Sequence, residues 1–109
     1  MIELKLKDTI EDIQIYEIID NIVIDIVVGG LELVPQPEID TIWIENINIK
    51  KEHRGNKYLK QVIEYLQNKY KCNIGALPLS KYRSYFESLG FTKTFQRGED
   101  IYYTLHYNI

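Results

Sequence analysis

The chain has 109 residues, a length that suits a single domain spanning residues 1–109. Its hydrophobic fraction of 45% and charged fraction of 27% are ordinary for a globular protein and exclude collagen-like, low-complexity and wholly disordered chains. No apolar run approaches the roughly 20 residues of a membrane helix, and the first residues show no signal peptide, so we expect no membrane association. The single cysteine, Cys72, cannot form an internal disulfide, which favours a reducing, cytoplasmic location.

Charge is unevenly distributed along the chain. The formal net charge is −3, which argues against a general nucleic-acid binder. Residues 1–45 carry 11 acidic and 2 basic residues, whereas residues 46–109 carry 5 acidic and 11 basic residues. Either the two halves attract each other in the fold, or they serve electrically different tasks.

The first half of the chain predicts four antiparallel strands, because its apolar residues alternate or are β-branched. The turn between the second and third strands is expected at Asp20 and Asn21, which both tolerate positive φ. Gly29 and Gly30 predict a bulge or bend within the third strand. The predicted strands cover residues 2–6, 13–19, 22–34 and 41–49.

In the second half of the chain, the spacing of apolar residues changes from that of a strand to that of a helix. Apolar residues from Leu59 to Tyr70 recur at helical spacing and predict an amphipathic helix. A short strand over 73–77 follows, then a helix over 81–89 with Ser80 as its N-cap and Gly90 as its C-terminal cap. A hairpin over 91–107 completes the chain. The expected fold class is α+β, with a mixed, mostly antiparallel sheet and two helices.

The segment 47–59 runs from a strand through a basic, glycine-containing turn directly into a helix. Such a junction gathers free backbone N–H groups and the positive end of a helix dipole at one place. The basic residues around it are Lys50, Lys51, Arg54, Lys57 and Lys60. We therefore expect an anion site, most naturally for phosphate, although a solvated helix start is the alternative. The Walker loop and the dinucleotide-binding fingerprint are both absent.

Residues 44–59 resemble the acetyl-coenzyme A motif of the GCN5-related N-acetyltransferases (GNAT), in which a strand is followed by Arg-Gly-x-Gly and a helix. The run Tyr-Phe-Glu-Ser-Leu-Gly-Phe over 85–91 resembles the second signature of that family. Together the two motifs and their elements cover residues 41–95. The resemblance implies a divergent, compact GNAT-like domain. It also implies an N-acetyltransferase that uses acetyl-CoA as co-substrate and transfers acetyl to an amine by direct attack on the thioester.

The resemblance further implies which residues bind acetyl-CoA. The backbone of Ile47 and Ile49 would bond the pantetheine arm. Lys57 replaces the second glycine of the family motif, where a lysine can assist phosphate binding. The pyrophosphate would lie on the loop formed by Arg54, Gly55, Asn56, Lys57 and Tyr58.

The same resemblance indicates the catalytic groups. In many members an acid on the strand before the loop is the general base, and Glu45 is the candidate here. On an ideal strand Glu45 shares the face of Ile47 and Ile49, toward the cleft. Phe86 stands where many members have a tyrosine that protonates the leaving thiolate, so it keeps the ring beside the cofactor but lacks the hydroxyl. Tyr82, four residues earlier on the same helix face, is placed to replace that acid.

The acidic first half flanks the acceptor position of the family, so a cationic amine is the expected acceptor. The two helices that shape the acceptor site in the family have no room between Leu6 and Ile13. A second hypothesis is a GNAT-like binding module, weak or inactive in catalysis, that acts through partner contacts. A nucleic-acid binder is a third, opposed by the acidic half and by a basic loop with Tyr58 as its only aromatic residue. No His, Cys or Asp cluster has metal-ligand spacing, so no metal is expected.

Overall fold

Seven strands and two α-helices make up the computed structural model, which describes residues 2–107. The strands are β1 (Ile2–Ile10), β2 (Ile13–Asp20), β3 (Ile26–Gln36), β4 (Thr41–Ile49), β5 (Asn73–Ala76), β6 (Thr92–Arg97) and β7 (Asp100–Leu105). The helices are α1 (Tyr58–Tyr70) and α2 (Arg83–Ser88), with short 3₁₀ turns η1 (Pro37–Ile39), η2 (Lys51–His53) and η3 (Ser80–Tyr82).

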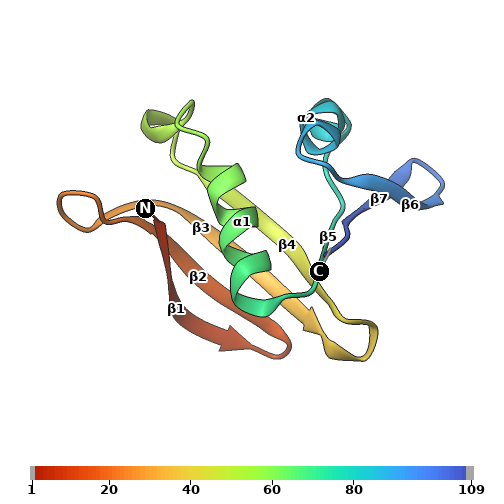
Figure 1. Cartoon of the computed structure of the whole chain (residues 1–109), viewed down its shortest axis with the longest axis horizontal. Coiled ribbons are helices and arrows are strands. Elements are labelled where there is room, and N and C mark those ends of the chain that lie inside the picture. The colour runs from red at the N-terminus through yellow and green to blue at the C-terminus, as the bar shows by residue number, and fades with distance from the viewer. Residues whose placement is uncertain (1, 108–109) are drawn as a thin grey trace.

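All seven strands form one sheet in the order β1-β2-β3-β4-β5-β7-β6, in which only β4 and β5 run parallel. Figure 1 shows α1 lying across the sheet beside β3 and β4, and α2 above the β5–β7 side. A parallel pair needs a crossover connection, and α1 supplies it between β4 and β5. The predicted α+β class with a mixed, mostly antiparallel sheet is confirmed.

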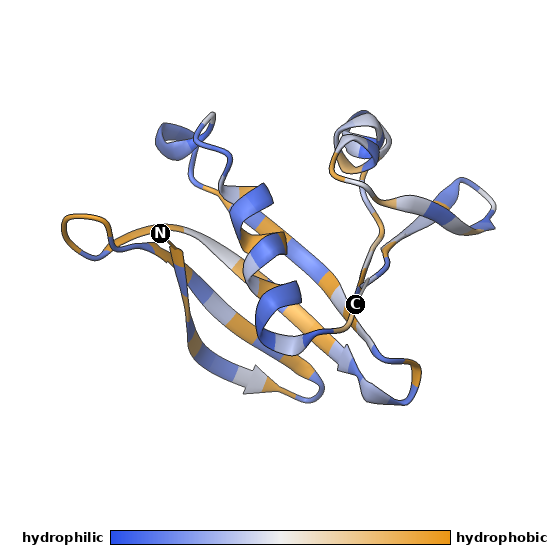
Figure 2. Cartoon of the chain, viewed as in Figure 1, coloured by the Kyte–Doolittle hydropathy of each residue, from blue (hydrophilic) through white to orange (hydrophobic). Residues whose placement is uncertain are grey.

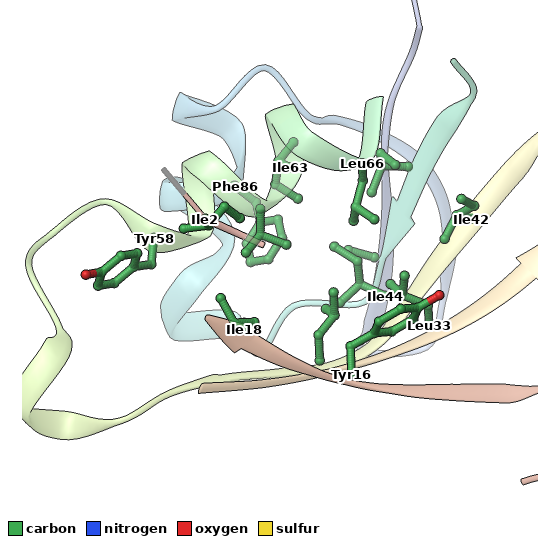
Figure 3. Close-up of a cluster of buried hydrophobic side chains, with 14 of the residues drawn as sticks. Ile2, Tyr16, Ile18, Leu33, Ile42, Ile44, Tyr58, Ile63, Leu66 and Phe86 are labelled. Atoms are coloured by element: carbon green, nitrogen blue, oxygen red, sulfur yellow. The ribbon is translucent and has the colours of Figure 1, made fainter. Parts of the chain in front are cut away.

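One face of α1 packs on the sheet. Val62, Ile63 and Leu66 are buried and join the core cluster that also holds Ile18 and Ile44 of β2 and β4. Figure 3 shows Leu66 of α1 directed toward Ile44 of β4. Burying each such aliphatic side chain contributes about 1.5–3 kcal/mol relative to leaving it in water. The helix predicted from the apolar period is confirmed, and its start at Tyr58 sets the position of the basic loop.

The connection between β2 and β3 differs from the predicted two-residue turn. β2 ends at Asp20, and β3 begins only at Ile26. The Oδ1 atom of Asp20 accepts a hydrogen bond from the Ile22 N–H at 3.1 Å, which takes that group away from strand pairing. The loop exposes Ile22 and Val23 by 73% and 88%, and Figure 2 shows it as an apolar segment. The prediction of a strand starting at residue 22 is therefore wrong.

The two glycines of β3 lie inside a continuous strand. The register with β2 shifts between Val27 and Gly29, so the bulge falls at Val28, beside the predicted position. A Cβ at Gly29 would lie 2.1 Å from the Asn48 carbonyl oxygen of β4. Gly29 is thus needed because the backbones of β3 and β4 approach closely there.

The second helix is shorter than the predicted span 81–89. The Tyr82 N–H bonds the Leu79 carbonyl at 2.8 Å, which makes a 3₁₀ turn, and the α-helical part runs only from Arg83 to Ser88. Ser80 makes no side-chain capping bond, so its predicted N-cap role is wrong. Gly90 has φ of +100° directly after the helix end, as the sequence predicted for a C-terminal cap.

Candidate functional site

The second half of β4 has a neighbouring strand on one side only. β5 pairs with β4 from Thr41 to Ile44 and ends at Ala76, two residues before Pro78, which has no N–H to donate. The Lys50 N–H donates to the Val28 carbonyl of β3 at 2.8 Å. By the alternation of a strand, the backbone groups of Ile49 and Ile47 therefore point away from β3. Among residues 2–107 no strand covers them, so residues 45–49 form a free strand edge.

This free edge begins at a β-bulge. Glu32 pairs with Asn46 and Leu33 pairs with Ile44, which leaves Glu45 as an extra residue in β4. The bulge interrupts the alternation of side chains, so Ile44 and Ile47, three residues apart, lie on the same face. Simple alternation along β4 therefore does not decide whether Glu45 shares a face with Ile47 and Ile49.

Glu45 nevertheless lines a cavity at the start of the free edge, the central cavity, of about 330 Å³. Tyr82 and Phe86 line it from η3 and α2. Tyr82 is 47% exposed, whereas Phe86 is only 6% exposed and packs against Phe91 at 5.1 Å between ring centres. The complete lining is Ile44, Glu45, Asn46, Ile47, Ala76, Leu77, Pro78, Leu79, Tyr82 and Phe86.

At the other end of the free edge, the basic loop connects β4 to the start of α1. Gly55 has φ of +91°, and Lys57, the residue before the helix, has φ of +59°. Within residues 2–107 no side chain caps the first N–H groups of α1, which leaves these donors available to a ligand. The loop surrounds a second cavity, the loop cavity, of about 360 Å³. Its lining is Ile49, His53, Arg54, Gly55, Lys57, Tyr58, Leu59 and Tyr85.

Hydrogen bonds within the loop separate its residues by role. The Arg54 Nε atom donates to the Ile49 carbonyl oxygen at 3.1 Å, so this carbonyl already has a partner. The Asn56 side chain donates to the His53 carbonyl at 3.1 Å, and the Asn56 carbonyl accepts from the Gln61 side chain at 3.2 Å. Asn56 does not line the loop cavity; its bonds brace the loop against α1.

The structure brings the predicted residues together in two groups. Glu45, Ile47, Tyr82 and Phe86 meet at the central cavity, and the other predicted acetyl-CoA-binding residues except Asn56 meet at the loop cavity. Of the basic residues expected around the anion site, Arg54 and Lys57 line the loop cavity, whereas Lys50, Lys51 and Lys60 do not. Tyr85 also lines the loop cavity, although the sequence analysis did not select it. Its position next to Phe86 could have indicated Tyr85 as a site residue, because successive helical residues point about 100° apart and can face different cavities.

Tyr58 ties the loop to the sheet. Its hydroxyl donates to the Oδ2 atom of Asp20 at the end of β2. This bond lowers the pKa of the Asp20 carboxyl and raises the pKa of the Tyr58 phenol. The start of α1 is thereby fixed beside the free edge of β4.

Two further observations bear on the kind of site. Within residues 2–107, no helix has the length and apolar character needed to cross a membrane. Over the same residues, no three His, Cys, Asp or Glu side chains are grouped so that they could hold a metal ion.

Comparison with solved structures identifies the fold. The chain is similar to Tetrahymena GCN5, with a TM-score of 0.70 and 11% identity over 91% of this chain and 71% of that chain. It is similar to an aminoglycoside 6′-N-acetyltransferase complexed with coenzyme A, with a TM-score of 0.69 and 13% identity over 91% of this chain and 75% of that one. A chimera of Vibrio cholerae spermidine N-acetyltransferase SpeG and hSSAT has a TM-score of 0.69 and 13% identity over 87% and 68% of the two chains.

No family model and no curated protein sequence matches the chain. The structural likenesses are nevertheless consistent with one another, and they place the chain in one architectural class. It has the acyl-CoA N-acyltransferase fold of the GNAT acetyltransferases. The fold that the two sequence motifs implied is confirmed.

Proposed function

We propose that this chain is an acetyl-CoA-dependent N-acetyltransferase. The observation that carries the proposal is the free edge of β4 with a cavity at each end. An extended thioester with phosphates at one end and a reactive carbonyl at the other suits this arrangement. The loop cavity offers cations and free N–H groups, and the central cavity offers Glu45 and Tyr82.

The loop cavity fits phosphate groups. Arg54, Lys57 and the first N–H groups of α1 supply positive charge and donors at one place. A Cβ placed on Gly55 meets no atom within 4 Å, so the space in front of this backbone is open. We infer that residues 54–58 hold the pyrophosphate of acetyl-CoA, with Tyr85 covering it from α2.

The free edge of β4 fits the pantetheine arm. The backbone of Ile47 faces this edge and can exchange hydrogen bonds with amide groups of the arm, as an added strand does. The Ile49 N–H faces the same way, while the Ile49 carbonyl is held by Arg54 at 3.1 Å. We therefore expect Ile47 to contribute both of its backbone groups and Ile49 chiefly its N–H.

The central cavity fits acyl transfer. The acetyl thioester supplies an activated carbonyl; the side chains of this cavity orient the amine and move its proton. Glu45 accepts the proton that the amine loses, directly or through water, as the nitrogen attacks the carbonyl carbon. The carbon–sulfur bond breaks, its electron pair leaves on sulfur, and Tyr82 donates a proton to that thiolate.

A cationic amine is the proposed acceptor, because most of the acidic residues lie in the first 45 residues. Two of the similar structures are named for amines of this kind, an aminoglycoside and spermidine. A cytoplasmic location is part of the same proposal, since acetyl-CoA is intracellular and the buried Cys72 is a free thiol.

Calorimetry with acetyl-CoA tests the binding part of the proposal. Gly55→Val should weaken binding at least tenfold, because a β-branched residue at this φ moves the backbone away from the phosphates. Gly98→Val is the matched control, since Gly98 also has positive φ with open space around it but lies in the β6–β7 turn. Equal affinity in the two folded variants would contradict the proposed phosphate site.

A binding module is the second candidate, and Phe86 is the observation that favours it. This ring lines the central cavity without a hydroxyl and is buried against Phe91. A chain that binds acetyl-CoA but cleaves it no faster with any amine than without one would support the module. Acetylated product measured by mass spectrometry, above the uncatalysed rate, would support the enzyme.

A further inference from the structure

A third cavity, the hairpin cavity, adjoins the central cavity. It has a volume of about 660 Å³ and lies between the β5–η3 segment, α2 and the β6–β7 hairpin. Leu77, Pro78 and Leu79 line both cavities, so a single segment of chain forms their common wall. This segment is what separates a molecule in the hairpin cavity from the cavity of Glu45 and Tyr82.

The hairpin cavity contains charged groups that are not paired with one another. Arg83, Glu99 and Asp100 all line it. The only ion pair within 4 Å among residues 2–107 is elsewhere, between Lys7 and Glu17. A cavity that keeps one guanidinium and two carboxylates unpaired complements a ligand that carries both signs of charge.

The guanidinium of Arg83 has hydrogen-bond donors that can bind a ligand. One terminal nitrogen, Nη2, donates to the backbone carbonyl of Glu99 at 2.7 Å, which holds the side chain against the hairpin. Its Nε atom is buried and has no partner in the described part of the chain. The other terminal nitrogen, Nη1, is not buried and forms no hydrogen bond with residues 2–107, so it is accessible to a ligand. Glu87, one turn further along α2, accepts instead from the Tyr103 hydroxyl at 3.0 Å.

We propose that the hairpin cavity binds an amino acid as the acetyl acceptor, with the acceptor carboxylate on Arg83 and any ammonium group that does not react toward the carboxylates of Glu99 and Asp100. This inference rests on the proposed acetyltransferase function and adds the acceptor class. A carboxylate on Nη1 forms a charge-assisted hydrogen bond, and a tilt of the guanidinium brings Nε to the same ligand. Diamino acids satisfy all three charged groups and still carry net positive charge.

The chemistry at the acceptor follows from this placement. The amine of the amino acid that reaches past residues 77–79 into the central cavity loses one proton to solvent and attacks the thioester carbon there, and Glu45 takes the second proton that the nitrogen loses. The nitrogen–carbon bond forms, the carbon–sulfur bond breaks, and the thiolate leaves with the electron pair. Arg83 takes no part in these bonds; it is a specificity-determining residue because it selects acceptors that have a carboxylate.

Pairs of amines that differ only in the carboxylate test this inference. The pairs are L-lysine with cadaverine, L-ornithine with putrescine, and L-alanine with ethylamine. We expect kcat/KM to be about tenfold higher for the carboxylate-bearing member of at least one pair, the size expected of one charge-assisted hydrogen bond. In Arg83→Gln this ratio should fall to about one, and Arg83→Lys should retain part of it. Arg97→Gln is the matched control, because Arg97 lies on the same hairpin but outside the cavity.

Binding gives a second measurement that does not need turnover. Calorimetry of each pair with protein saturated in acetyl-CoA should show the same ratio and the same loss in Arg83→Gln. No preference for any carboxylate-bearing amine in the wild type, or a preference that Arg83→Gln leaves intact, would overturn the inference. Acetyl-CoA affinity is measured separately in the same samples. If the protein binds acetyl-CoA but does not discriminate between the members of a pair, the proposed amino-acid acceptor is wrong and the proposed acetyl-CoA site is retained.

Discussion

The Tyr58 hydroxyl, on the first residue of α1, donates a hydrogen bond to the Oδ2 atom of Asp20, 38 residues earlier at the end of β2. The second carboxylate oxygen of Asp20 accepts from the Ile22 N–H. The Asp20 side chain thus holds two segments: the start of α1, beside the loop cavity, and the loop that follows β2. The strength of this link depends on the charge of Asp20.

Stability should therefore depend on pH through Asp20. The bond to Tyr58 lowers the pKa of Asp20 below its ordinary value of 3.8, so the folded state favours the ionised carboxylate. Such a group stabilises the fold above its unfolded pKa, and this contribution is lost as pH falls through the folded pKa. We expect Asp20→Asn to lower the melting temperature at pH 7 and to lose most of this difference from wild type below pH 3.8. Asp25→Asn in the same loop is the control, and an equal pH dependence of the two variants would contradict the role of Asp20.

Lys57 should show opposite effects on stability and on binding. Its φ of +59° lies in the left-handed region, which is costly for a residue with a Cβ. Lys57→Gly should raise the free energy of unfolding by about 0.5–1 kcal/mol, since the relief of strain exceeds the added freedom of the unfolded chain. The same change should weaken acetyl-CoA binding severalfold, because a cation leaves the loop cavity. Lys71→Gly, with φ of +51° at the other end of α1, should stabilise the fold and leave binding unchanged.

Glu45 is expected to matter for turnover and not for acetyl-CoA affinity. Removing a general base typically costs ~10²–10⁴-fold in rate, so Glu45→Gln should lower kcat within that range. Glu52→Gln, in η2 outside both cavities, is the charge-matched control. Steady-state thioester cleavage would show the difference, and an unchanged kcat in Glu45→Gln would remove this role.

Phe86 and Tyr82 allow the general acid to be located. If the thiolate departs without a strong acid, Phe86→Tyr should raise kcat, by at most ~10²–10⁴-fold, with little change in acetyl-CoA affinity. If Tyr82 already supplies the proton, Tyr82→Phe should lower kcat and Phe86→Tyr should change it little. Both variants need circular dichroism, because a new hydroxyl beside Phe91 is stable only if it points into the central cavity. A fast wild-type rate that neither substitution changes would exclude an acid at either position.

The acceptor should carry positive charge, and its reaction should depend on ionic strength. The acidic first half of the chain attracts cations at long range, and salt screens this attraction over about 10 Å at 0.1 M. We expect kcat/KM for cadaverine and L-lysine to exceed that for L-glutamate and to fall as sodium chloride is added. Rates measured from 20 mM to 500 mM salt, with neutral sucrose as the control, would test this. Best activity with L-glutamate, or rates independent of salt, would be incompatible with a cationic acceptor.

Local patterns in the sequence determined α1 and the loop before it. Val62, Ile63 and Leu66 recur at helical spacing, and this spacing alone defines which face of the helix is apolar. The loop cavity could also be predicted in outline, because the residues from Arg54 to Tyr58 that line it are neighbours along the chain. Their closeness in space needs no knowledge of the rest of the fold.

The tertiary structure decided whatever depends on strand register and on distant partners. The bulge at Glu45 arises from how β3 and β4 align, and a shift of one residue in that alignment moves side chains to the other face. Arg83 is positioned by its hydrogen bond to the Glu99 carbonyl, 16 residues away. Asp20 is likewise positioned by the hydrogen bond that it accepts from the Tyr58 hydroxyl, 38 residues away. No local pattern marks such pairs, because they form only after the helices have packed on the sheet and brought separate segments within hydrogen-bond distance.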